Sequence, residues 1–149
     1  MKSLIIKIIS TFFLSSLSFL SFSSEKEVLE TIYKWADLES DLDAQAKLIR
    51  DDRVMIASKR WPNQAENLMI QKERREANLS RDPDLKIIAT ISSPVVRIYD
   101  DVAIADFVRR SDFIPGMGEM SPPTFTYITL VLVEEDGNWG IAHTHNSPM

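Results

Sequence analysis

The chain of 149 residues contains no cysteine and only two histidines and four glycines. Without thiols it can form no disulfide, thiolate metal site or cysteine nucleophile. Its one Gly-x-Gly pattern, Gly116 to Gly118, lacks the strand-to-helix context of a phosphate-binding loop. A nucleophile elbow is also missing. We therefore predict no cofactor.

Basic charge is scarce as well. Lys2 and Lys7 lie in the N-terminal segment discussed next, which leaves 15 basic against 22 acidic residues beyond it, a net charge of −7. The one basic cluster, at residues 72–75, is interleaved with glutamates, a pattern typical of a solvated helix face. Phosphate contact favours a basic stripe, so no nucleic-acid partner is expected.

The N-terminus has the features of a secretory signal. Positive charge at Lys2 and Lys7 accompanies an apolar run from Leu4 to Phe22, which ends in small residues suited to a cut after Ser23. The alternative is an uncleaved anchor, but serines interrupt the run and a spanning helix needs about 20 predominantly apolar residues. We predict a signal peptide over 1–23 and a periplasmic or secreted domain over 24–149, without membrane contact after cleavage.

Two helices and a short strand are expected at the start of that domain. Apolar residues recur at spacings of three and four over residues 25–36, which predicts an amphipathic helix. A second helix is predicted over 41–49, with Asp41 as its cap. Residues 54–57 follow as a short buried strand.

A third helix is predicted from about Gln64 to Ser80. Asn63 and Glu66 have the spacing of a capping box, in which side chains satisfy free backbone donors at the helix start. The expected buried residues of its first turns are Ala65, Leu68 and Met69.

The rest of the domain is predicted to be β-structure. Four segments rich in β-branched and aromatic residues cover 85–99, 102–113, 124–134 and 139–145. Tight turns are expected at Asp100-Asp101 and at Asp136-Gly137-Asn138. Helices segregated from an antiparallel sheet give an α+β fold, with one sheet face covered by helices.

Both ends of the domain resemble the NTF2-like superfamily and its SnoaL-like members. The opening similarity lies in Trp35-Ala36 and in residues 41–44 and 51–54. At the other end, residues 136–147 are similar to the closing strand, where a glycine turn leads to a tryptophan and a histidine-containing tail. The resemblance implies a cystatin-like cone, about three helices packed on a strongly curved, mainly antiparallel sheet. It further implies a homodimer and a pocket between sheet and helices, but no particular reaction.

The last strand supplies the first site candidates. If no bulge intervenes, alternation places Trp139, Ile141, His143 and His145 on one face. Since Trp139 and Ile141 are apolar, we expect that face to be covered, with both imidazoles at the pocket or its rim. Such imidazoles serve in acid–base chemistry near neutral pH, although structural hydrogen bonding is the alternative. A shared metal would need a third ligand such as Asp106, and no metal is predicted.

Asp106 is the second catalytic candidate, beside His145. It interrupts an apolar strand in phase with its aliphatic residues, and an inward carboxylate is costly unless it is paired or functional. A general base in the pocket is one possibility. Pairing with Arg97, Arg109 or Arg110 is another, and a solvent-facing carboxylate is a third.

Aromatic residues complete the predicted ligand-binding set. Trp35 on the first helix and Tyr127 on the third of the four strands join Trp139, His143 and His145, with core packing as the alternative role of the aromatic side chains. The segment 115–123, rich in proline, glycine and methionine, is either a flap over the pocket or a plain connection.

Three functions fit these features. The first is binding of a small, largely apolar molecule. The second is an isomerase, cyclase or dehydratase that uses Asp106 or His145 as general base. The third is a ligand-free dimeric interaction module that uses the convex face of the sheet. A closed core combined with an apolar, exposed sheet face would favour the third.

Overall fold

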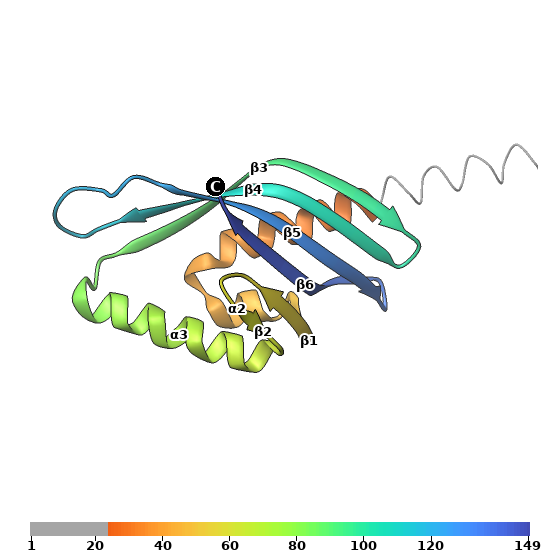
Figure 1. Ribbon diagram of the computed structural model, residues 1–149, viewed down its shortest axis with the longest axis horizontal. Coiled ribbons are helices and arrows are strands. Elements are labelled where there is room, and N and C mark those ends of the chain that lie inside the picture. The colour runs from red at the N-terminus through yellow and green to blue at the C-terminus, as the bar shows by residue number, and fades with distance from the viewer. Residues whose placement is uncertain (1–23) are drawn as a thin grey trace, which may run out of the picture.

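The computed structural model describes residues 24–149, so the predicted leader lies outside the described residues. Residues 24–37 are helical and are called the N-terminal helix below. The other elements are η1 (Leu38–Ser40), α2 (Leu42–Ala46), β1 (Ile49–Ile56), β2 (Arg60–Trp61), α3 (Gln64–Arg81), β3 (Lys86–Tyr99), β4 (Val102–Ile114), β5 (Thr124–Glu135) and β6 (Asn138–Pro148) (Figure 1). Within 24–149, no helix has the length and apolar character that a membrane span requires.

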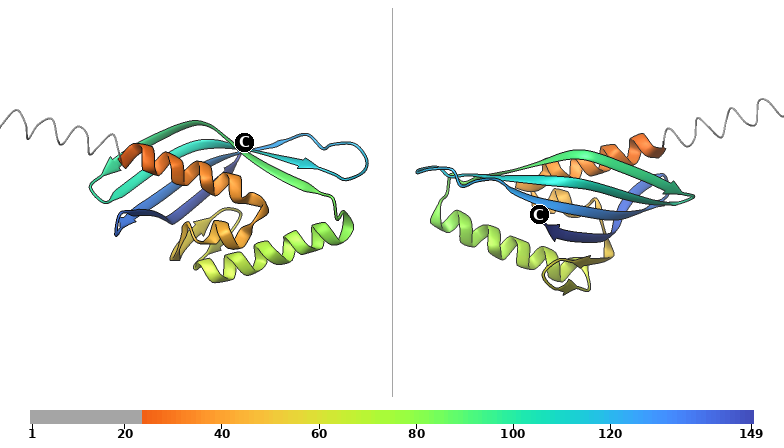
Figure 2. Two further views of the ribbon diagram at one scale, coloured as in Figure 1. Left: turned by 180° about the vertical axis from the view of Figure 1, so that it is seen from behind. Right: turned by 45° about the horizontal axis from the view of Figure 1, so that its top comes forward.

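The strands form one sheet in the order β2-β1-β6-β5-β4-β3. Every pairing is antiparallel except that of β1 with β6. The helices of residues 24–149 gather on one side of the curved sheet, and none of them lies on the other side (Figure 2). The predicted α+β cone, a mainly antiparallel curved sheet with helices on one face, is confirmed.

The predicted hairpin turns are confirmed by their backbone angles. Asp136 and Gly137 have φ values of 52° and 76°. Positive φ at both central positions is the mark of a type I′ turn, whose twist matches that of the flanking strands. Asp100 also lies in the left-handed region, with φ of 55°.

The second helix is shorter than expected. Asp41 does cap it, accepting the backbone N–H of Ala44 at 3.0 Å, but the helix ends at Ala46. Ile49 already belongs to β1, where it pairs with Ile141 of β6. The prediction of helix up to residue 49 was wrong because this long-range pairing outweighs local helical spacing.

The cap of α3 is confirmed, while its predicted buried face is wrong. Asn63 accepts the backbone N–H of Glu66 at 2.8 Å. The buried residues are Gln64 and Asn67, whereas Met69 is exposed. Since the first turns of α3 rest on β1 and β2, the polar capping side of the helix faces the protein there.

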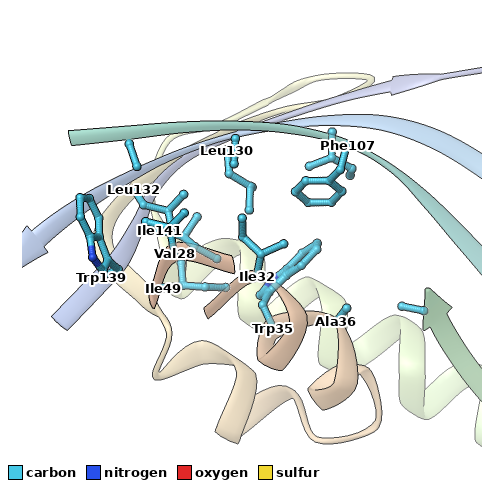
Figure 3. Close-up of a cluster of buried hydrophobic side chains, with 14 residues drawn as sticks. Val28, Ile32, Trp35, Ala36, Ile49, Phe107, Leu130, Leu132, Trp139 and Ile141 are labelled. Carbon is cyan, nitrogen blue, oxygen red and sulfur yellow. The ribbon is translucent and has the colours of Figure 1, made fainter. Parts of the chain in front are cut away.

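The core lies between the N-terminal helix and the sheet. Trp35 stands edge-on to Phe107 of β4, with ring centroids 6.3 Å apart. Figure 3 shows helix side chains meeting those of the strands. The cluster consists of Val28, Ile32, Trp35, Ala36, Ile49, Ala89, Ala103, Ala105, Phe107, Ile128, Leu130, Leu132, Trp139 and Ile141. These side chains fill the space between the N-terminal helix and the middle of the sheet.

Candidate functional site

A bulge in β6 decides where the two histidines point. Ile141 pairs with Leu132, but His143 pairs with the preceding residue of β5, Val131, so Ala142 is an extra residue. An extra residue in one strand reverses the alternation beyond it. Ile141 therefore faces the helices, whereas His143 shares the opposite, helix-free face with Val131. The prediction that both histidines share the covered face with Trp139 and Ile141 was wrong for this reason.

Asp106 lies on the same helix-free face. It pairs with Thr129 of β5, which in turn pairs with His145 of β6. Thr129 Oγ1 donates a hydrogen bond to Asp106 Oδ1 at 2.7 Å. On β4, Ala103 and Ala105 are buried against the helices. Asp106 is the next residue along the strand, so alternation places its side chain on the open face. This is the solvent-facing alternative of the sequence analysis.

None of the three candidate arginines pairs with Asp106. Arg109 points to the helices and binds Glu39. Arg110 binds Asp112, whose carboxylate accepts bonds of 2.7 and 2.8 Å. The hydroxyl of Thr129 is therefore the hydrogen-bond donor that Asp106 has among the described side chains.

The row Asp106–Thr129–His145 gives little support for catalysis. Two strand spacings separate Asp106 from His145, about 10 Å between their backbones. A shallow hollow of about 420 Å³ lies beside Asp106 and Tyr127, and it is open to solvent. General acid–base work needs groups within hydrogen-bond reach of a reacting atom. Residues 24–149 also hold no group of three or more His, Asp or Glu side chains that could bind a metal.

The helix-free face is largely apolar. Tyr127, a predicted ligand-binding residue, is 55% exposed there, and Phe125 and Val95 on the same face are 43% and 49% exposed. We call the apolar residues of this face the open-face patch; they are Ile56, Val95, Tyr99, Ile104, Val108, Phe125, Tyr127 and Val131. Of the described sheet, this is the side against which no helix packs (Figure 2).

The tryptophans predicted to bind ligand lie in the core. Trp35 and Trp139 are each only 6% exposed and belong to the core cluster. The core-packing alternative thus describes both positions. Their roles in ligand binding stay predictions, as do those of Tyr127, His143 and His145.

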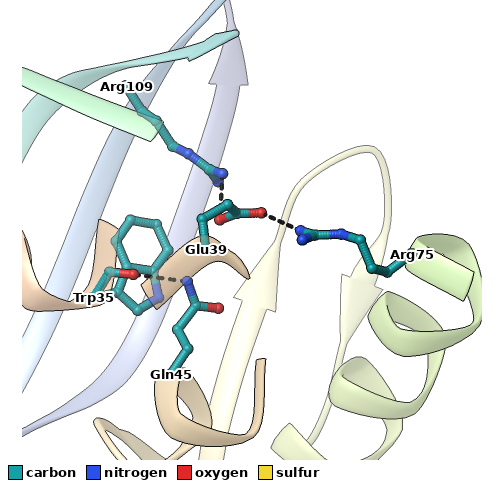
Figure 4. A network of polar contacts seen from close by, with 5 residues as sticks. All are labelled: Trp35, Glu39, Gln45, Arg75 and Arg109. Atoms are coloured by element: carbon teal, nitrogen blue, oxygen red, sulfur yellow. Dashed lines mark hydrogen bonds and ion pairs between the residues drawn. The ribbon is translucent and has the colours of Figure 1, made fainter. Parts of the chain in front are cut away.

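Charged side chains close the end of the N-terminal helix against the sheet. Glu39 of η1 accepts hydrogen bonds from Arg75 of α3 at 2.9 Å and from Arg109 of β4 at 2.6 Å (Figure 4). The Arg109 guanidinium also lies 5.4 Å from the centre of the Trp35 ring. A cleft of about 410 Å³ opens beside Glu39 and Arg75. The network joins η1, α3 and β4, and both arginines share the carboxylate of Glu39.

Sequence reasoning missed one buried cation. Arg53 on β1 is 2% exposed, and burial lowers the pKa of its guanidinium to about 10. At neutral pH the group is therefore still charged. Flanked in sequence by Asp51, Asp52 and a valine, it has the pattern of a surface residue, so the sequence carries no signal for its burial.

Comparison with known protein families identifies the domain. Residues 24–149 match the family described as calcium/calmodulin dependent protein kinase II association domain. The chain belongs to this family. No curated protein matches it.

Solved structures show the same fold as this association domain. An NTF2-like protein with a cystatin-like fold from Novosphingobium aromaticivorans is 13% identical, with a TM-score of 0.75, covering 90% of this chain and 87% of that one. The CaMKII hub of S. rosetta is 20% identical, with a TM-score of 0.64 and coverage of 83% and 95%. A putative CaMKII association domain from Xanthomonas campestris is 22% identical, with a TM-score of 0.62 and coverage of 83% and 86%. The NTF2-like fold is confirmed, and the narrower SnoaL-like resemblance stays a prediction.

Proposed function

We propose that this association domain joins copies of its own chain through the open-face patch. The observation that carries the proposal is the patch itself. Its large apolar side chains are exposed on β3 and β5, and the half-buried Ile104 and Val108 of β4 lie between those strands. Contiguous exposed apolar surface of this kind is typical of protein–protein contacts. The family is described as an association domain, and the similar S. rosetta protein is described as a hub.

The filled core favours association over a pocket for an apolar molecule. The space between the N-terminal helix and the sheet is occupied by the core cluster. The cleft of about 410 Å³ that remains between η1, α3 and β3 is open to solvent and has Glu39 and Arg75 in its lining, which suits an apolar molecule less well. Aromatic side chains on a sheet face, in contrast, are well suited to the desolvated centre of an interface.

The polar groups of the same face fit a symmetric contact. Arg97 and Asp106 lie on this face on adjacent strands, and they carry opposite charges. In a two-fold contact each surface meets itself, so a cation of one copy can approach an anion of the other. We propose that Arg97 and Asp106 pair in this way at the homodimer contact.

The test compares two tyrosine substitutions by analytical ultracentrifugation. Tyr127→Glu places a charge in the patch and should weaken self-association at least tenfold, since a charge buried at an interface without a partner is costly. Tyr33→Glu is the matched control, because Tyr33 is also exposed but lies on the N-terminal helix. It should leave the dissociation constant unchanged.

Two results would overturn the proposal. One is a wild-type protein that is still monomeric at a concentration of about 1 mM, where association with a dissociation constant below the millimolar range would be visible. The other is equal weakening by both substitutions. Circular dichroism of each variant separates loss of association from loss of fold.

We also propose that the domain acts after export, in the periplasm or outside the cell. The support is the order of charge, apolar run and small residues over 1–23. Intact-mass measurement of the protein from its own cells should give a chain that begins at Ser24. A chain that retains Met1 would contradict cleavage.

A further inference from the structure

Both histidines of the chain lie on the open face of the sheet. The sequence contains two, His143 and His145, and the extra residue Ala142 turns both away from the helices. His143 is half-buried on this face and His145 is exposed. The surface that we propose as the homodimer contact therefore carries every imidazole of the protein.

The strands on either side of β6 place no charge against these imidazoles. Their cross-strand neighbours are uncharged: Val54 and Val131 flank His143, and Ile56 and Thr129 flank His145. The Thr129 hydroxyl donates its hydrogen bond to Asp106. Within residues 24–149 neither imidazole forms an ion pair. A proton gained by either histidine thus adds a positive charge that no anion contacts within the monomer.

The charged and titratable side chains of this face lie farther away. The nearest ones along the row of His145 are Asp106 on β4 and Arg60 on β2, each two strand spacings distant, about 10 Å between backbones. The others around β6 are Tyr127 on β5, Arg97 on β3, and Asp52 on β1, which Arg50 binds. The carboxylate of Asp106 is the anion that we assign to Arg97 of the second copy, which leaves none for the histidines.

We propose that protonation of His143 and His145 in mild acid releases the homodimer. This inference rests on the proposed self-association through the open-face patch. Histidine is the side chain whose charge ordinarily changes between about pH 5 and 8. In a two-fold contact each copy contributes the same surface, so the two histidines of each copy bring their charges to one interface together.

The direction of the effect follows from desolvation of the contact. A charge that is taken out of water without a partner costs free energy, so the associated form binds protons less readily than the separated copies do. By linkage, the dissociation constant rises as the pH falls. Carboxylates ordinarily gain their protons near pH 4, so loss of the Arg97–Asp106 pair belongs to stronger acid.

The test is analytical ultracentrifugation at pH 7.5 and pH 5.5 and constant ionic strength. The dissociation constant of the wild type should rise about tenfold or more at the lower pH. The variant with both His143→Gln and His145→Gln should have nearly the same constant at both pH values. Arg60→Gln is the matched control, because it removes a charge of the same face that does not titrate in this range. It should keep the wild-type ratio of the two constants.

Each result decides a separate point. Equal constants of the wild type at both pH values, or tighter association at pH 5.5, would overturn the switch and leave self-association standing. The same holds for a wild-type ratio that persists in the histidine-free variant. A wild type that is monomeric at pH 7.5 would instead refute the self-association on which the switch rests.

Two further measurements keep the test decisive. If the double variant no longer associates at pH 7.5, His145→Gln alone should still lower the ratio, and an unchanged ratio would count against the switch. Circular dichroism of the wild type at pH 5.5 should show an intact fold. Loss of the fold at that pH would contradict the proposal, since dissociation would then follow from unfolding.

Discussion

The two faces of the sheet are formed by the same strands, but they differ in whether polar side chains interrupt their rows of apolar side chains. On β5 the covered face carries Ile128, Leu130 and Leu132 without a polar interruption, and the N-terminal helix seals it. The open face of the same strand alternates Tyr127 and Val131 with Thr129, whose hydroxyl binds Asp106. An apolar face alone therefore does not identify the core side of a strand; an unbroken aliphatic row together with a helix of matching pattern does.

The largest expected effect separates the faces at adjacent positions. Leu130→Ala, at a residue with no exposed surface, should lower the free energy of unfolding by about 2–5 kcal/mol because it leaves a cavity in the core. Val131→Ala, its neighbour on the open face, should cost about 1 kcal/mol or less in the monomer. Urea denaturation at a concentration below self-association measures both. Equal costs would contradict the contrast between the faces.

A second, smaller effect concerns the ion pairs that join the covered face to the helices. Glu39→Gln leaves Arg75 and Arg109 without their shared carboxylate and should lower the free energy of unfolding by about 1–3 kcal/mol. Asp43→Asn breaks the exposed pair with Lys72 and should change it by no more than about 0.5 kcal/mol. Thermal unfolding of both variants decides, and a larger loss in Asp43→Asn would refute the ranking.

The smallest expected effect is a gain. Arg53→Met removes a buried charge that has no ion-pair partner among the described residues, and should raise the free energy of unfolding at pH 7 by about 1 kcal/mol. Burial lowers the folded pKa of Arg53 from its ordinary value to about 10, so the folded state releases its proton first as the pH rises. Wild-type stability contributed by this group therefore increases above pH 10, and the advantage of Arg53→Met should shrink there. Urea denaturation at pH 7 and above pH 10 tests the sign.

Much of the architecture could be predicted from local signals. The Asp-Gly turn between β5 and β6 and the Asn63 cap of α3 each rest on a few adjacent residues, and both were placed correctly. The limits of α2 were not, because Ile49 joins β1 through pairing with Ile141, far along the chain. Local chemistry determines turns and caps, whereas strand pairing at long range decides between a helix and a strand.

The orientation of the candidate site could not be predicted, for two physical reasons. On β4 both faces are apolar, and the smaller residues Ala103 and Ala105 are the buried ones because Trp35 and its helix need that space. On β6, Ala142 has the character of any strand residue, and nothing in its neighbours marks a bulge. The phase of a strand therefore depends on the partner strand and on the volume of the layer above it.

The central position of β6 has a consequence for the order in which the fold is completed. It joins β1 on one side to β5 on the other, so the segment that starts with Ile49 reaches the β3–β5 meander only through residues 138–148. Contacts between segments so distant in sequence form late, because the closure of a long loop precedes any stabilisation from the pairing. A chain that has synthesised β1 to β5 thus holds two strand edges, one on β1 and one on β5, that only β6 covers.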